Sequence, residues 1–117
     1  MKKLLLFVVT FFSMVLAADN PCVFAQYYEL RSVWSDKCLD VDWSHGDING
    51  ANAQQWDCSS EGRINQLWEL KPLSGGCYQI ISKSSGKCLD VDLNIGSGLI
   101  DGANVQQWEC LGEGQSN

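Results

Sequence analysis

Two sets of polar and aromatic side chains recur along this chain in the same order and with similar spacing. The first set consists of Asp40, Gln54, Trp56, Asn65 and Gln66. The second set consists of Asp90, Gln106, Trp108 and Asn117. A carboxylate accepts hydrogen bonds from two hydroxyls at once, amides both donate and accept, and an indole offers a flat apolar face. These groups suit a neutral sugar, which carries hydroxyls on its edge and a weakly positive C–H surface on its face.

The two sets recur because the chain contains an internal repeat. A shift of 50 residues aligns 27–42 with 77–92, and the hexapeptide KCLDVD is identical in both copies. After a two-residue difference in the next loop, INGANAQQWDC at 48–58 aligns with IDGANVQQWEC at 100–110, at an offset of 52. A fixed period of this size indicates one supersecondary unit that is used repeatedly.

Each unit consists of short alternating segments between turn residues, which is typical of β-strands. The strands expected in the first copy are Tyr27–Ser32, Cys38–Asp42, Ala53–Cys58 and Leu67–Lys71. Asn49-Gly50 and Asp101-Gly102 supply left-handed turn positions between strands. No stretch after residue 26 keeps a helical period for two turns, so the sequence predicts an all-β fold.

Alternation along a strand determines which candidate side chains share a face. Cys38 shares a face with Asp40, and Cys58 shares a face with Trp56. A disulfide between Cys38 and Cys58 would gather the carboxylate, the Gln54 amide and the indole on one side of the two strands. The matching pair in the second copy is Cys88 and Cys110. Each bond would close a loop of about 20 residues, worth roughly 3 kcal/mol on the chain-entropy model.

These motifs, in this order, resemble the repeat of the ricin-type β-trefoil lectins, also known as the (QxW) repeat family. The motifs are CLDV at 38–41, QQWDC at 54–58 and NQLW at 65–68, and the second copy matches them as far as the chain extends. The resemblance covers 27–117. It implies a β-trefoil of ricin-lectin type and a carbohydrate-binding function, with glycans or polysaccharide as partners.

The resemblance also implies a role for each candidate residue. The positions that hold galactose or a related sugar are those of Asp40, Trp56 and Asn65, with those of Gln54 and Gln66 assisting. In the second copy the matching set is Asp90, Gln106, Trp108 and Asn117. Trp68, in the NQLW motif, is expected at the centre of the barrel and not in the site.

Family members usually carry three such repeats, which close a pseudo-threefold barrel. This sequence carries two, with 26–75 as repeat one and 76–117 as repeat two. The expected fold is therefore an incomplete trefoil whose second lobe lacks its last strand. Because Gly114–Asn117 aligns with Gly62–Asn65, we expect an intact gene to continue with Gln and, two positions later, Trp.

The N-terminal segment 1–25 has the layout of a secretory signal peptide. Two lysines precede a mostly apolar run at 4–16, which is too short for a membrane anchor. Cleavage can follow Ala17 or Ala25, and Ala25 is favoured because the strand pattern starts directly after it. The sequence therefore predicts a secreted protein with a partial lectin domain at 26–117.

The site of cleavage decides the state of the two remaining cysteines. Cleavage after Ala25 removes Cys22 and leaves Cys77 unpaired. Cleavage after Ala17 keeps Cys22, which can then bond Cys77 because both precede equivalent first strands. The sequence leaves both pairings open.

Net charge disfavours two classes of partner. Removal of 1–25 takes away Lys2, Lys3 and Asp19, so 8 basic and 14 acidic residues become 6 and 13, a net charge of −7. Nucleic acids and anionic membranes both require a basic face. No basic run follows Lys3. We therefore expect neither partner. No cysteines form the close Cys-x-x-Cys pairs that zinc sites favour, and we expect no metal or cofactor.

Two other functions fit the residues less well. A calcium-binding loop is suggested by Asp40, Asp42 and Ser44, but His45 displaces the sharp-turn glycine and Ala51 replaces the bidentate Glu. An enzyme with paired carboxylates needs an acid and a base in different environments, whereas these acids recur by repetition. We therefore predict a non-catalytic domain, either independent or split as a targeting module from a larger glycoside-active protein.

Some roles stay open at this point. Asp40 can serve instead as the cap of the turn at 44–46. Gln55 and Gln107 point by alternation toward the apolar face, where the family more often has Leu or Ile, and a buried amide needs partners. Trp43, which is unmatched in the second copy, either extends the sugar platform or packs within its loop.

Overall fold

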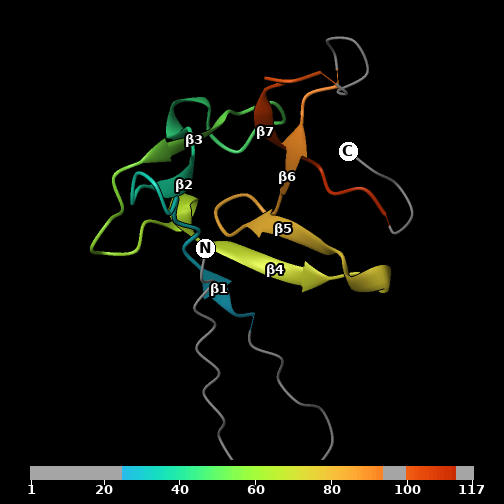
Figure 1. The fold of residues 1–117 in the computed structure, drawn as a ribbon, viewed down its shortest axis with the longest axis horizontal. Helices are drawn as coiled ribbons and strands as arrows, with labels where there is room; N and C mark the ends of the chain where they lie inside the picture. Colours follow the sequence, from blue (N-terminus) through green and yellow to red (C-terminus); the bar gives the residue numbers. More distant parts are fainter. Residues whose placement is uncertain (1–24, 94–99, 113–117) are drawn as a thin grey trace, which may run out of the picture.

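The computed structural model describes residues 25–93 and 100–112, which form two lobes of the same design (Figure 1). Cys22, Asn117 and all of the expected leader except its last residue lie outside the described residues. Within the described ranges the regular structure is strands and short 3₁₀ turns, with no α-helix. None of the helical segments there has the length and apolar character that a membrane span requires.

The strands follow the order expected from the sequence. Lobe one contains β1 (Tyr27–Tyr28), β2 (Cys38–Val41), β3 (Ala53–Trp56) and β4 (Trp68–Pro72). Lobe two contains β5 (Tyr78–Ser82), β6 (Cys88–Val91) and β7 (Val105–Trp108). The 3₁₀ turns are η1 (Trp43–His45), η2 (Ile64–Gln66) and η3 (Ser74–Gly76). Three of the four strands predicted in the first copy are confirmed, with their ends shifted by one or two residues.

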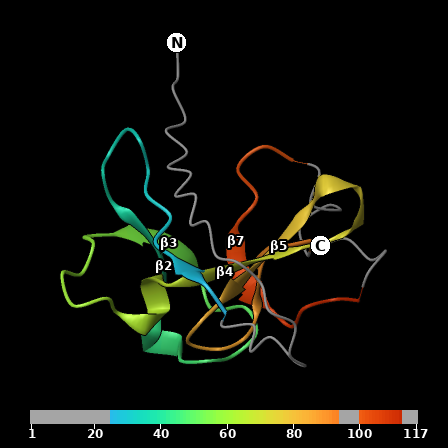
Figure 2. The ribbon, with the colours of Figure 1, turned by 90° about the horizontal axis from the view of Figure 1, so that it is seen from below.

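The strands of the described residues form two antiparallel sheets, in which β2 and β3 lie on one side and β6 and β7 on the other (Figure 1, Figure 2). One sheet has the order β1-β4-β5-β6-β7, and the other pairs β2 with β3. The β2–β3 register places Cys38 opposite Trp56 and Asp40 opposite Gln54, and β6 and β7 repeat this register. Neither sheet closes on itself within the described ranges, as expected for an incomplete trefoil.

The first predicted strand is shorter than expected because its residues change partners. Its first two residues, β1, pair with β4, whereas Arg31 forms an isolated bridge with Cys38 of β2. In lobe two, the single strand β5 pairs with both β4 and β6, and its Ile81 lies opposite Cys88 of β6. The same pairing scheme therefore holds in both lobes, at the 50-residue offset of the sequence.

The core is small and centred on Trp68. Trp68 and Val41 are almost completely buried, and the partly buried side chains packed against them include Leu39 and Leu89. The Trp68 indole N–H donates to the Leu39 carbonyl oxygen (3.1 Å), which satisfies its one polar group. The expectation that Trp68 belongs to the core is confirmed.

Two disulfides link the strands that carry the candidate residues. Cys38 bonds Cys58, and Cys88 bonds Cys110, as the repeat predicted. The bonds enclose loops of similar length, with sequence separations of 20 and 22 residues. Cys77 has no disulfide partner among the described residues, and its side chain is exposed.

The loop between β2 and β3 joins lobe one to β7 of lobe two (Figure 1). The backbone N–H of Gly50 donates to the Gln107 carbonyl, and the N–H of Gln107 donates to the Ala51 carbonyl, both at 2.9 Å. Gly50 has the left-handed φ of 86° that was predicted for this turn, and Gly102 matches it in lobe two at 82°. A side chain at Gly50 would strain this turn at the contact between the lobes.

The buried side chain of Gln107 completes this contact and explains an unusual residue choice. Its Nε2 donates to the carbonyl oxygens of Gly46 (3.2 Å) and Ile48 (2.9 Å), and its Oε1 accepts from Ser85 Oγ (2.7 Å). A buried amide with three partners is satisfied, as polar groups in a core must be. Gln55, at the matching position of lobe one, is exposed.

Replacement of the core indole should unfold lobe one. We expect Trp68→Ala to lower the free energy of unfolding by about 3 to 5 kcal/mol, because it removes a fully buried ring. Trp34→Ala is the matched control, since that ring is 98% exposed and its loss should change stability by no more than about 0.5 kcal/mol. Thermal melting of both variants measures this, and equal losses would contradict the position of the core.

The two glutamines provide a second matched pair. Gln107→Leu leaves the carbonyls of Gly46 and Ile48 without a donor, so we expect a loss of about 1 to 3 kcal/mol in urea unfolding. Gln55→Leu, at the exposed matching position, should cost no more than about 0.5 kcal/mol. A Gln107→Leu protein as stable as the wild type would show that the contact between the lobes does not need this amide.

Candidate functional site

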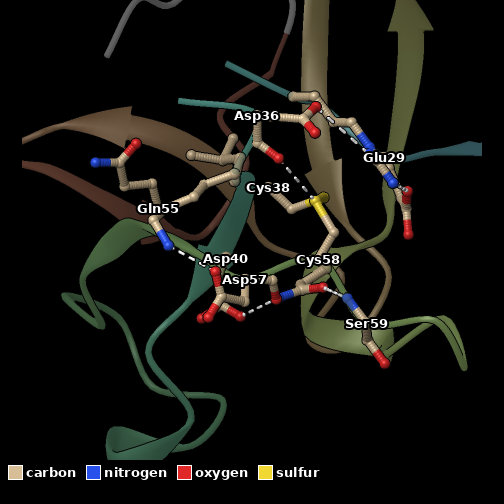
Figure 3. The surroundings of a disulfide bond; sticks show 12 residues. Glu29, Asp36, Cys38, Asp40, Gln55, Asp57, Cys58 and Ser59 are labelled. Atoms are coloured by element: carbon tan, nitrogen blue, oxygen red, sulfur yellow. Dashed lines mark hydrogen bonds and ion pairs between the residues drawn. A yellow bond between two sulfur atoms is a disulfide. The ribbon is translucent and has the colours of Figure 1, made fainter. Parts of the chain in front are cut away.

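The carboxylate of Asp40 is the centre of the candidate site in lobe one. Its Oδ2 accepts hydrogen bonds from the side-chain amides of Asn65 (3.0 Å) and Gln66 (2.9 Å). Its Oδ1 accepts a longer bond from Gln54 Nε2 (3.3 Å). Figure 3 shows this carboxylate on β2, two residues along the strand from the disulfide of Cys38. The structure thus brings four of the five candidates of the first copy together at one acidic group.

The alternative role of Asp40 as a turn cap is wrong, because Asp42 caps that turn. Asp42 Oδ1 accepts from the backbone N–H of Ser44 (2.9 Å) and from its hydroxyl (2.7 Å). These hydrogen bonds from Ser44 lower the pKa of Asp42 below its ordinary value. The Asp40 carboxylate instead accepts hydrogen bonds from Asn65 and Gln66 of η2.

Gln66 holds the Asp40 carboxylate in place. The Gln66 side chain is completely buried, and its Nε2 donates to Asp40 and to the Asp57 carbonyl oxygen (3.0 Å). Its Oε1 accepts from the backbone N–H of Ser59 (2.9 Å). Every polar atom of this amide is used inside the protein, so Gln66 can position Asp40 but has no hydrogen left to offer a ligand.

Asn65 is bound in a way that leaves its oxygen free. Its Nδ2 donates to Asp40 and to the Val41 carbonyl oxygen (3.0 Å), which uses both amide protons. The Oδ1 atom makes no hydrogen bond within the described part of the chain, and Asn65 lines a surface pocket. A ligand hydroxyl can therefore donate to this oxygen.

Asp40 also keeps acceptor capacity. Its two oxygens offer about four lone-pair positions, and three are occupied by the amides. The remaining position is on Oδ1, the oxygen with the longer bond to Gln54. No group of three or more metal-binding side chains occurs in 25–93 or 100–112.

Trp56 supplies an aromatic surface at the end of β3. Its side chain is 53% exposed, and it lines a pocket of about 460 Å³ together with Arg63. Lys37 donates to Asp57 Oδ1 at 2.6 Å beside it, and this hydrogen bond lowers the pKa of Asp57. The charge of Asp57 is thus neutralised locally, while the Trp56 ring stays open to solvent.

Lobe two contains the same arrangement in a more covered form. Gln106 Nε2 donates to Asp90 Oδ2 (2.9 Å), and both side chains are buried. Trp108 is 37% exposed, less than Trp56, because the turn at Gly50 lies against its ring. A Cβ atom added at Gly50 would be 3.9 Å from Trp108 Cζ3. The remaining predicted residue of this set, Asn117, lies outside the described residues.

A neighbouring pocket contains two residues that the motifs did not single out. It has a volume of about 420 Å³ and is lined by Trp43, Arg63, Ile64 and Asn65. Arg63 and Ile64 directly precede the NQLW motif, so only their position beside Asn65 could have indicated them. Trp43 lines this pocket, which extends the surface next to the Asp40 site.

Comparisons with known proteins concern the family and the fold of the chain. A family model described as ricin-type beta-trefoil lectin domain-like matches residues 19–108 of this chain. No curated protein matches the chain.

Three solved structures have similar folds. The designed three-fold symmetric protein ThreeFoil is 40% identical with a TM-score of 0.65, over 74% of this chain and 57% of that chain. An exo-beta-1,3-galactanase from Clostridium thermocellum is 32% identical with a TM-score of 0.62, over 75% of this chain and 18% of that chain. A Polyporus squamosus lectin is 19% identical with a TM-score of 0.59, over 80% of this chain and 30% of that chain. This is a likeness of fold alone.

This chain spans only part of each of these proteins. The family match nevertheless covers most of the sequence, and it includes both Asp40 and Asp90. The chain belongs to the ricin-type β-trefoil lectin-like family.

Proposed function

We propose that this chain is a secreted, non-catalytic carbohydrate-binding domain whose main site surrounds Asp40. The observation that carries the proposal is the Asp40 carboxylate, which two amides from η2 hold in place on the lobe that exposes Trp56. The ricin-type lectin-like fold supports carbohydrate binding in general. A carboxylate and an exposed ring together match the edge and the face of a sugar.

Each side chain of the site has a separate task. The free acceptor position of Asp40 and the Oδ1 of Asn65 accept hydrogen bonds from sugar hydroxyls. The Gln54 amide, which uses only one N–H on Asp40, keeps a second N–H and its oxygen for the ligand. Trp56 packs against the C–H face of the ring, and Gln66 keeps the carboxylate oriented.

We favour a galactose-type sugar over a xylan-type sugar. The similar bacterial enzyme is an exo-beta-1,3-galactanase by name, and its 32% identity to this chain supports a related ligand. A shallow site with few contacts should bind one sugar in the millimolar to high micromolar range, about 4 to 6 kcal/mol. Asp90, Gln106 and Trp108 form a second, more covered site, and two sites on one polysaccharide raise avidity.

The domain fits the role of a targeting module as well as that of an independent lectin. The chain covers 18% of the galactanase chain, so the similarity concerns a small part of a larger enzyme. A parent protein with a catalytic domain would use such a module to stay on its polysaccharide. The two disulfides are consistent with an oxidising compartment, which supports secretion through the leader at 1–25.

The Trp56 ring should be needed for binding but not for folding. On a glycan array with galactosides and xylo-oligosaccharides, we expect the wild type to bind and Trp56→Ala to lose detectable binding. The melting temperature should change by only a few degrees, because the ring is half exposed.

Trp34→Ala is the control for loss of an exposed indole that is not among the candidate site residues, and it should bind as the wild type does. A wild type that binds no glycan on the array would refute the proposed function. A Trp56→Ala variant that binds as well as the wild type would refute the role of this ring.

A further inference from the structure

The pocket beside the Asp40 site is joined to it through Asn65. The Asn65 Nδ2 donates a hydrogen bond to Asp40 Oδ2 (3.0 Å). Asn65 also lines the pocket of about 420 Å³, together with Trp43, Arg63 and Ile64. A ligand that reaches Asp40 therefore has a second cavity next to it. The pocket is large enough to accept a further sugar unit.

Trp43 gives this pocket an aromatic wall. The ring is 56% exposed, and η1, which carries it, is held at its start by the hydrogen bonds between Asp42 and Ser44. At its end the N–H of Gly46 donates to the Trp43 carbonyl (3.2 Å), and the Gly46 carbonyl in turn receives the buried Gln107 amide. An exposed indole on a constrained turn is a suitable surface for a sugar ring.

Arg63 brings a positive charge to the pocket and forms no ion pair within the described ranges, although it also lines the neighbouring pocket that contains Asp57 and Glu61. No carboxylate of 25–93 or 100–112 forms an ion pair with Arg63, whereas Arg31 contacts Glu29 (3.1 Å) and Asp36 (3.6 Å). The pocket lining contains no Asp or Glu. In a chain of net charge −6, Arg63 is therefore a cationic side chain that remains available to a negatively charged ligand.

The two copies of the internal repeat share the residues around Asp40 but differ at the residues of this pocket. The positions of Asp40, Gln54, Trp56 and Asn65 are occupied by the same residue types in both copies. The positions of the pocket residues Trp43, Arg63 and Ile64 are occupied in the second copy by Leu93, Gln115 and Ser116. The aromatic ring and the charge therefore belong to lobe one only, although the common site was duplicated.

We propose that this pocket is a subsite for a sugar that carries a carboxylate and is linked to the sugar held at Asp40. The inference rests on the proposed carbohydrate-binding function and specifies its ligand as an acidic oligosaccharide. Trp43 packs against the ring of the acidic sugar, and the guanidinium of Arg63 donates two parallel hydrogen bonds to its carboxylate. Ile64 contacts its apolar edge.

Two disaccharides that differ only at one carbon test this subsite. Glucuronosyl-β-1,6-galactose carries a carboxylate where glucosyl-β-1,6-galactose carries a hydroxymethyl group. By calorimetric titration at low salt we expect the wild type to bind the acidic disaccharide about tenfold more tightly, the gain that a hydrogen bond to a charged group provides.

The two arginines of the chain make the matched variants. Arg63→Gln should lower the affinity for the acidic disaccharide to that for the neutral one, and Arg31→Gln should keep the tenfold preference. Trp43→Ala should weaken binding of the acidic disaccharide without unfolding the protein, because its ring is exposed.

Equal affinity of the wild type for both disaccharides would overturn the subsite and leave the proposed function intact. An equal loss of preference in Arg31→Gln and Arg63→Gln would also overturn it, since the effect would then come from overall charge. If neither disaccharide nor any neutral galactoside binds, the proposed function fails, and the subsite fails with it.

Discussion

The buried carboxylate of Asp40 is the group on which the rest of this structure depends. A carboxylate that is only 4% exposed needs hydrogen-bond donors, and Asn65 and Gln66 supply them from η2. The same short segment leads directly into Trp68, whose indole donates to the strand that carries Asp40. The site and the core are therefore parts of one connected unit, so the geometry offered to a ligand is fixed by packing and not by the ligand.

The contact between the lobes extends this unit. Gln107 of β7 holds the carbonyls of the loop that follows Asp40, and that loop carries Trp43. The turn at Gly50 lies in return against Trp108, which leaves the second aromatic surface less open than the first. Two copies of one sequence motif thus acquire different environments because each packs against a different neighbour.

Local sequence patterns predicted most of the fold. The features that depend on contacts between segments far apart in the sequence could not be predicted in this way. Alternation and the internal repeat gave the strands, the disulfides of Cys38 and Cys88, and the shared face of Asp40 and Gln54, because each depends on short-range periodicity. Alternation could assign Gln55 and Gln107 to a face but could not show that only Gln107 is covered by another lobe. The pocket of Trp43 and Arg63 escaped the motifs because its walls come from two loops that are close only in the folded chain.

Nuclear magnetic resonance of the tryptophan indole N–H groups gives the most direct test of the site around Asp40. The five tryptophans differ in position: Trp68 is buried, Trp34 is fully exposed, and Trp56 is the proposed platform. During titration of labelled wild-type protein with methyl β-galactoside, we expect a saturable shift of the Trp56 indole signal and of the Asn65 side-chain amide, with Trp34 and Trp68 unchanged. Saturable shifts confined to other tryptophans, or no shift at Trp56 at millimolar sugar, would contradict the assignment of the site to Asp40 and Trp56.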